Sequence, residues 1–513
     1  MVRLWPHPGP LLPSGLPKFG SPRGLGLGLG GPALWQSSQR RALITLGIET
    51  SCDDTCVSVI NTAADGSLIA LMKRSKVTCA NKHHRGIHPV EAVESHTRNL
   101  AKLAQNVLKH HKPDLIAVTR GPGMKSCLSV GISFAKALSV ACRVPLVGVH
   151  HMQAHALSIQ LDAQELAISH RGGGPAQDVV SPEYPFLTLL VSGGHTMLVL
   201  TKSAIEHRVL ASTQRGITNP SEKGKGSATA VGEMLDKCAR DILPPQFLPG
   251  GRNSDSIVYA HWMEIYCKAG VPSYSKEMLD EYKPPQEYHE QVQVYHSKDG
   301  SWSLPPPLRH TKDMTYDFTG LGGKARAIMQ QNPDMQRMER MELAYHTMRL
   351  AFEHLMSRVI LALENDPELL ASPPQSLVIA GGVASNMFLR NVAASVLQAR
   401  GFGHVDVRAP RHMYCTDNAA MIAWAGQKMY TAGWTTDLSF LPQDEWPIEE
   451  ILTGVDCWVH KDDVEASEPE PVTQDEGDQI KADAKPVPGP KPSRDGKGAA
   501  DSGGPSRPQE ATA

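Results

Sequence analysis

The chain has 513 residues, more than a single hydrophobic core normally holds, so we expect at least two lobes or domains. Its 51 basic residues nearly balance its 53 acidic ones, which excludes nucleic-acid binding through overall charge, so any such surface must be a local patch. No run of about 18 apolar residues is free of charges, and we therefore predict no membrane span.

The two ends of the chain differ in composition from the middle. From Met1 to Ile48 there is no Asp or Glu, while several arginines supply positive charge, as in organellar transit peptides. We assign residues 1–41 to a mitochondrial transit peptide, which predicts a location in the matrix. Residues 461–513 contain almost no large apolar side chains, so burial cannot offset their ordering entropy, and we predict a disordered tail.

Between these ends, short apolar runs alternate with helical patterns. A hairpin is followed by helices and strands, and a second hairpin is followed later by a long helix and a buried strand. The repetition predicts two related α/β lobes, at residues 42–160 and 161–460, with a cleft between them. The elements are a hairpin (42–48, 56–60), helix 91–111, strand 114–119, helix 133–142, strand 144–149, a hairpin (185–191, 196–201), helix 335–364 and strand 377–382. Residues 168–184 and 214–229 resemble inserted surface loops, and residues 283–310 fit no pattern.

Four turns rich in small residues follow apolar strands, and such turns can hold phosphate. In GIETSCDDT (47–55), Asp53 or Asp54 can hold a metal, orient water or act as a base. The other three are RGPGMKSCLSVG (120–131), LVSGGHT (190–196) and IAGGVASNMFLR (379–390), where Asn386 can bond a base or ribose. Each turn alone is more often structural than functional. Together, in a chain without a P-loop or dinucleotide fingerprint, they favour a nucleotide cleft.

A possible metal site is divided between two distant motifs. HHMQAH (150–155) places His151 and His155 on one face of a helix, but such a pair often arises by chance among 22 histidines. Asp417 in YCTDNAAMIAW (414–424) is a candidate third ligand, although it also suits a helix cap. The motif lacks the glutamate of HExxH metalloproteases. Two histidines and one aspartate suit zinc or ferrous iron, and spacing does not separate these metals.

Eight motifs, taken together, resemble one known family. These motifs occur between Leu46 and about Gly433, in the order typical of the bacterial-type tRNA threonylcarbamoyladenosine transferases, and they are most like the organellar members of that family. They are GIETSCDDT, RGPGM, HHMQAH, LVSGGHT, GEMLDKCAR, LPGG, GGVASN and CTDNAAMIAW. The resemblance implies the two-lobed α/β fold of the actin-like ATPases and sugar kinases, with an interlobe nucleotide cleft. It also implies the metal ligands His151, His155 and Asp417, a catalytic Asp53, and an adenylate pocket formed by Leu190, Val191, Ser192, Gly193, Gly194, Asp236, Gly251 and Asn386.

The activity implied by the resemblance is threonylcarbamoyl transfer from threonylcarbamoyl-AMP to N6 of the adenosine 3′ of the anticodon in ANN-decoding mitochondrial tRNAs. A zinc or iron ion, an adenylate supplied by a separate synthase and a homodimer are expected with it. The acidic residues that usually precede the GEMLDK helix in this family are absent from Ser227 to Gly232, so the resemblance implies no role for them here. The alternatives are an ATP-dependent small-molecule kinase or carbamoyltransferase on the same fold, and a non-catalytic nucleotide-binding scaffold. A plain kinase would not need the His-His-Asp set, and a scaffold would be expected to have lost part of it.

Overall fold

The computed structural model describes residues 42–80, 87–170, 181–214, 228–247, 259–269, 279 and 281–466. Residues through His460 form one unit by contact, and those from Lys461 form another, of which the helix α14 (Lys461–Ala466) is described. The predicted transit peptide and the rest of the predicted tail lie outside the described residues, as do residues 171–180 and 215–227 of the two predicted surface loops.

The first sheet contains the strands that the apolar runs predict. Its order is β3-β2-β1-β4-β5, in which β1, β2 and β3 are antiparallel neighbours and β4 and β5 run parallel to β1. All residues of β4 and β5 are buried, as expected for parallel strands covered on both faces. The edge strand β3 is not among the predicted strands, because lysines and an arginine interrupt its apolar pattern. The bounds are β1 Leu43–Glu49, β2 Asp54–Thr62, β3 Leu68–Thr78, β4 Leu115–Gly121 and β5 Leu146–His150.

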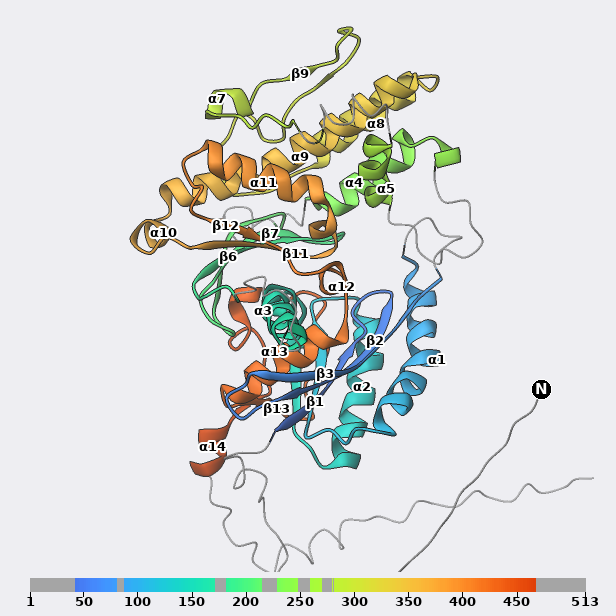
Figure 1. Cartoon of the computed structure of the whole chain (residues 1–513). Helices are drawn as coiled ribbons and strands as arrows, with labels where there is room; N and C mark the ends of the chain where they lie inside the picture. Colours follow the sequence, from blue (N-terminus) through green and yellow to red (C-terminus); the bar gives the residue numbers. More distant parts are fainter. Residues whose placement is uncertain are drawn as a thin grey trace, which may run out of the picture. The chain divides into compact units, whose positions relative to one another are not determined.

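Helices α1 (Pro89–Leu108) and α2 (Lys125–Cys142) pack against this sheet (Figure 1). Both are predicted from the sequence, but α2 begins at Lys125 rather than at residue 133, directly after the Gly-Pro turn. By length and composition α2 is the one described helix able to cross a membrane. Core helices pass the same test, and Leu128 and Ile132 of α2 belong to the core of this lobe.

The second sheet repeats the strand order of the first. Its order is β12-β11-β6-β7-β8, with β6, β7 and β8 antiparallel and with β11 and β12 parallel to β6. Strands β6, β7, β8, β11 and β12 thus occupy the places of β1 to β5, which confirms the prediction of two related α/β lobes. The bounds are β6 Phe186–Val191, β7 Thr196–Thr201, β8 His207–Ser212, β11 Ser376–Ala380 and β12 Asp406–Arg408.

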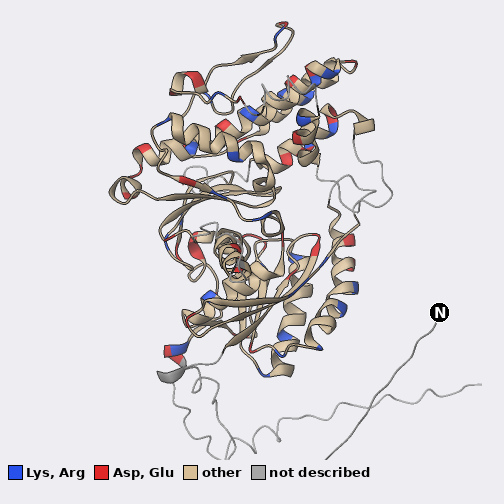
Figure 2. Ribbon diagram, in the orientation of Figure 1, with Lys and Arg blue, Asp and Glu red and all other residues tan. Residues whose placement is uncertain are grey.

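The largest core lies between the second sheet and the helices above it (Figure 1). The predicted long helix is α9, and its middle turns are buried on all sides. The helices are α4 Val231–Ile242, α5 Tyr259–Lys268, α8 Thr319–Gln331, α9 Arg337–Asn365 and α11 Met387–Ala399. Figure 2 shows both acidic and basic residues along α4 and α9, in keeping with the balanced composition.

Residues 281–310, which we call the strap, lie along α9 and contain little regular structure. They include α7 (Tyr288–Gln291) and the short strands β9 (Tyr295–His296) and β10 (Ser303–Leu304). The hydroxyl of Tyr282 donates a hydrogen bond to Glu353 of α9 at 2.9 Å. The ring of Tyr295 stacks on His346 with centroids 3.4 Å apart. Side-chain contacts of this kind carry no periodic signal, which explains why sequence patterns do not predict the segment.

Two helices lie between the sheets and share one core with both. Helix α3 (His151–His170) contacts β6 and β11, and α13 (Ala419–Thr431) packs on β1, β2, β4 and β5. A Cβ atom on Gly47 of β1 would lie 2.0 Å from the carbonyl oxygen of Ala419, so only glycine permits this close approach. These contacts do not follow the predicted division of the lobes at residue 160. Helix α3 includes residues on both sides of that position, and α13, from the range 161–460, packs on the first sheet.

The remaining described elements are short. Strand β13 pairs with β14 in an antiparallel ribbon, and β13 also contacts β5. The bounds are α10 Pro367–Ala371, α12 His412–Cys415, β13 Trp434–Thr436, β14 Trp458–His460 and three single-turn 3₁₀ helices, η2 Pro245–Phe247, η4 Gly382–Ser385 and η5 Ile448–Glu450.

Candidate metal centre and substrate-binding turns

The first turn of α3 and the loop before α13 bring two histidines and an aspartate together. His151 and His155 have ring centroids 4.7 Å apart. Asp417 Oδ1 lies 3.4 Å from His151 Nε2 and 3.2 Å from His155 Nε2. Ligand atoms bound at about 2.0–2.1 Å to a tetrahedral metal lie roughly 3.3–3.4 Å apart, so the three residues fit such an ion. In the part of the chain that the structure describes, no other cluster of this kind occurs.

Buried charges set the protonation of this cluster in the absence of an ion. Burial alone would lower the pKa of His151, but the carboxylates of Glu49 and Asp417 outweigh burial and raise that pKa to about 10. Burial alone would raise the pKa of Asp417, but His151 and His155 outweigh burial and hold that pKa well below its usual range. An ion that binds His151 Nε2 must therefore displace a proton.

Glu49, the last residue of β1, orients His151. Its Oε2 lies 3.1 Å from His151 Nδ1 and accepts a hydrogen bond from Thr119 Oγ1, while its Oε1 accepts one from the backbone N–H of Ser51. A carboxylate behind a metal-binding histidine fixes the tautomer and leaves Nε2 free for the ion. Glu49 was not among the residues predicted from the sequence. Its only signal is an acidic residue at the end of a strand that is otherwise buried and apolar.

A group of ion pairs holds the loop that carries Asp417. Arg411 donates hydrogen bonds from its backbone N–H and its Nε to Asp162 of α3, at 2.7 and 2.5 Å, and its Nη2 contacts Glu165. The hydroxyl of Tyr414 also donates to Glu165, at 2.8 Å. Helix α3 therefore supplies the two histidines and also anchors the segment that supplies the aspartate.

Gly193 and Gly194 of the predicted adenylate pocket lie in the turn between β6 and β7, next to glycines at the start of α4 and the end of β11. No described atom lies within 4 Å of a Cβ position on Gly193 or Gly194, so the turn between β6 and β7 leaves room for a ligand next to its backbone. The N–H of Gly232, at the start of α4, donates to the carbonyl oxygen of Ser192 at 3.2 Å. Gly381, at the end of β11, has φ of 96°, and a Cβ there would lie 2.4 Å from the oxygen of Val191. Two of the four predicted turns are therefore in contact.

The other predicted pocket residues have structural partners of their own. Leu190 and Val191 are buried within β6, so only their backbone can face a ligand. Asp236 Oδ1 accepts the N–H of Ala260 at the start of α5, at 2.7 Å. Asn386 is the N-cap of α11, and its Oδ1 accepts the N–H of Leu389. Gly251 lies outside the described residues.

His195 links the glycine turn to the metal centre and was not among the residues predicted from the sequence. Burial, together with the neighbouring charges of His151 and His155, lowers the pKa of His195 to about 4. Asp53 approaches the same centre from the β1–β2 turn. Burial raises its pKa, and the charge of Asp417 adds to this effect. The two hairpin turns, one from each lobe, thus both lie near the predicted metal ligands.

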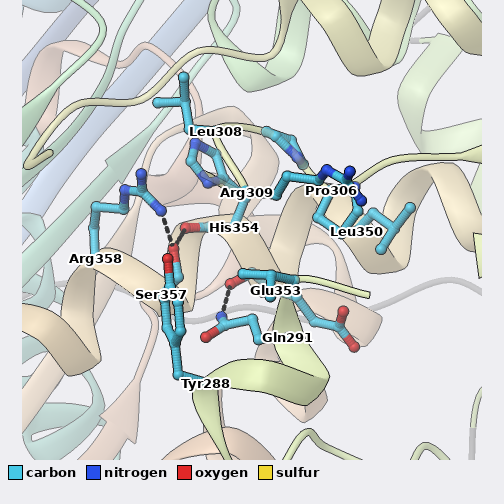
Figure 3. Close-up of a pocket in the computed structure, with 12 residues that line it drawn as sticks. Tyr288, Gln291, Pro306, Leu308, Arg309, Leu350, Glu353, His354, Ser357 and Arg358 are labelled. Carbon is cyan, nitrogen blue, oxygen red and sulfur yellow. Dashed lines mark hydrogen bonds between the residues drawn. The ribbon is translucent and has the colours of Figure 1, made fainter. Parts of the chain in front are cut away.

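Two pockets differ in size and position. The first lies under the strap and has a volume of about 20 Å³, room for about one water molecule. Figure 3 shows its lining, in which Gln291 donates a hydrogen bond to the backbone of Glu353 beside Ser357 and Arg358. The second has about 330 Å³ and borders Asp417. Of these two, the second is large enough for part of a substrate, and it adjoins the metal centre.

Comparison with known proteins decides the family. The family model for tRNA N6-adenosine threonylcarbamoyltransferase matches residues 68–424. The chain belongs to this family. It is 33% identical to the mitochondrial tRNA N6-adenosine threonylcarbamoyltransferase of Schizosaccharomyces pombe, over 82% of this chain and 90% of that protein.

Other relatives carry the same family name. A tRNA N6-adenosine threonylcarbamoyltransferase of Rickettsia bellii is 29% identical over 79% of this chain and 99% of its own length. A probable mitochondrial form from Arabidopsis thaliana is 29% identical over 76% of this chain and 70% of its own length. Among solved structures, HypF of T. kodakarensis aligns with a TM-score of 0.40 at 12% identity, over 76% of this chain and 48% of that chain. The threonylcarbamoyltransferase family membership agrees with the actin-like fold expected from the eight motifs.

Proposed function

We propose that this protein transfers a threonylcarbamoyl group from threonylcarbamoyl-AMP to N6 of the adenosine 3′ of the anticodon in ANN-decoding mitochondrial tRNAs. The observation that carries the proposal is the set His151, His155 and Asp417, held at the spacing of metal ligands next to the β6–β7 glycine turn. In this reaction the amine nitrogen forms a bond to the carbamoyl carbon, the bond from that carbon to the phosphate oxygen breaks, AMP leaves, and the amine loses a proton.

Different residues of the chain would bind the adenylate and accept the proton. Backbone N–H groups of Gly193 and Gly194 would hold the adenylate and offset charge on the leaving phosphate, while the N–H of Ser192 closes the turn by donating to the carbonyl oxygen of His195. Asp236, Asn386 and Gly251 stay predicted members of that pocket. Asp53 is the candidate acceptor for the amine proton, because its raised pKa brings a carboxylate closer to the range that suits a general base.

The predicted ligands would hold one divalent ion, zinc or ferrous iron. When bound, such an ion acts as a Lewis acid and offsets charge on the substrate oxygen. Glu49 would keep His151 in the tautomer that presents Nε2, and Arg411 would keep the Asp417 loop in place.

The mitochondrial location is supported by the names of two relatives and by the acid-free start of the chain. The proposal places the enzyme in the matrix, with its adenylate made by a separate synthase. A homodimer is proposed as well. It rests on the resemblance to the organellar members of the family.

The test is nucleoside mass spectrometry of tRNA from cells in which Asp417→Ala is the only copy of this protein. We expect threonylcarbamoyladenosine to disappear from ANN-decoding mitochondrial tRNAs and to persist in cytosolic tRNAs. The matched control is Asp406→Ala, which removes an exposed aspartate from β12. An unchanged mitochondrial level in the Asp417→Ala cells would refute the role of Asp417, and an unchanged level after full deletion would refute the transferase assignment.

A further inference from the structure

The pocket that borders Asp417 has a positively charged wall that the transfer reaction, as described so far, does not use. The wall comes from the edge strand β3, which contributes Arg74, Ser75 and Lys76. The opposite side is the loop before α13, with Thr416, Asp417 and Asn418. Because Asp417 Oδ1 is directed to the two histidines, the carboxylate of this loop faces the metal centre.

Arg74 has a guanidinium group that can bind an anion. Its guanidinium lies over the ring of Tyr414, 5.6 Å from the centroid, and its Nη1 is buried with no hydrogen-bond partner among the described residues. No described carboxylate forms an ion pair with Arg74. A buried guanidinium N–H without an acceptor is costly, and the oxygens of phosphates and carboxylates are the acceptors that its planar group fits.

Two further features favour an anion at the same place. Lys76 pairs with Asp54, and its Nζ also donates to the backbone oxygen of Asp417 at 3.2 Å, so its ammonium group stays at the pocket wall. Ala419, the first residue of the 13-residue helix α13, also lines the pocket. The N-terminus of a helix presents unpaired N–H groups and a partial positive charge.

We propose that the pocket between Arg74, Lys76 and the start of α13 binds a phosphate group of the RNA backbone beside the target adenosine. The inference rests on the proposed function and adds a docking point for the tRNA. RNA is favoured over the adenylate as the source of the phosphate. The pocket wall comes from the first lobe, whereas the turns predicted to hold the adenylate come from the second. One phosphate fixed next to Asp417 would set the register of the anticodon loop relative to the reacting carbon.

The test measures tRNA binding by the full chain, loaded with metal, across a series of salt concentrations. Arg74→Gln removes the charge, Arg74→Lys keeps it, and Lys73→Gln removes the same charge from a neighbouring residue of β3 that does not line the pocket. We expect Arg74→Gln to weaken binding of an ANN-decoding tRNA roughly ten-fold and to reduce the slope of log K against log salt by about 0.7–0.9. Arg74→Lys should recover most of the affinity, and Lys73→Gln should change it less than two-fold.

Three readouts separate this role from a structural one. Melting temperature, bound metal and affinity for threonylcarbamoyl-AMP should be the same in Arg74→Gln as in the wild type. The inference is overturned if Arg74→Gln and Lys73→Gln bind tRNA equally well, or if only the affinity for the adenylate falls. Failure of the proposed function looks different, because wild-type protein would then bind tRNA without transferring the group.

Discussion

Replacing Glu49 by glutamine tests whether the carboxylate behind His151 controls metal affinity. Glu49 is fully buried and accepts three hydrogen bonds, from His151, Thr119 and the backbone of Ser51. A glutamine of the same shape has one acceptor oxygen in place of two, so it cannot accept all three. Loss of the partner behind a metal-binding histidine typically weakens metal binding 10- to 100-fold, which corresponds to about 1.4–2.7 kcal/mol. We expect the dissociation constant for zinc to rise by that factor in Glu49→Gln.

The measurement is competition for zinc against a chromophoric chelator, with metal content checked by mass spectrometry. Glu264→Gln is the matched control, because Glu264 is also a buried carboxylate but belongs to α5 and contacts Lys268 and the N–H of Met387. Both variants should remain folded by circular dichroism. Zinc affinity of Glu49→Gln within two-fold of the wild type would refute the reasoning, and so would an equal loss in Glu264→Gln.

Two further predictions concern stability. Gly47→Ala should lower the free energy of unfolding by about 3 kcal/mol in chemical denaturation, because the new Cβ would meet the backbone of Ala419. Gly193→Ala, where the Cβ would enter open space, should change the free energy of unfolding by less than about 0.5 kcal/mol. Equal effects of the two substitutions would contradict the packing argument. Burial, together with the nearby charges of Arg349 and Lys298, lowers the pKa of His346 to about 2. Its neutral form therefore stabilises the fold above the unfolded pKa of about 6.5, and that contribution falls as the pH drops below it. Between pH 7.5 and 5.5 the loss should be about 1.4 kcal/mol, and His346→Gln should remove it; the same pH dependence in His346→Gln would contradict the assignment.

The fold was largely predictable because its strands are buried on both faces. Such strands appear as continuous apolar runs, and the two hairpins, the long helix and the repeated lobe all follow from them. Edge strand β3 carries Lys73, Arg74 and Lys76, so its pattern resembles a surface segment. The return of α13 to the first sheet was not predictable either, because it depends on a close approach between Gly47 and a helix far along the chain.

The candidate site was predictable only in part. The spacing of His151 and His155 indicates a shared helix face, but their meeting with Asp417 joins positions that are 262 residues apart. That meeting was implied by family resemblance and not by periodicity. Glu49 and His195 were missed for the same reason, since each acts through neighbours brought near it by the fold. Whether Asp236 and Asn386 contact the adenylate stays a prediction.

The matching strand orders of the two sheets are what duplication of a single α/β unit would produce, and the two hairpin turns then descend from one ancestral turn. In the first copy, the turn after β1 is flanked by Glu49 and Asp53. In the second copy, the turn after β6 consists of Ser192 and two glycines with open space around them. The turn in the first lobe carries acidic side chains near the predicted metal ligands, whereas the turn in the second lobe has two glycines that leave room for a ligand. Equivalent places in two sheets of the same strand order thus differ in chemistry, with acidic side chains in one lobe and open backbone in the other.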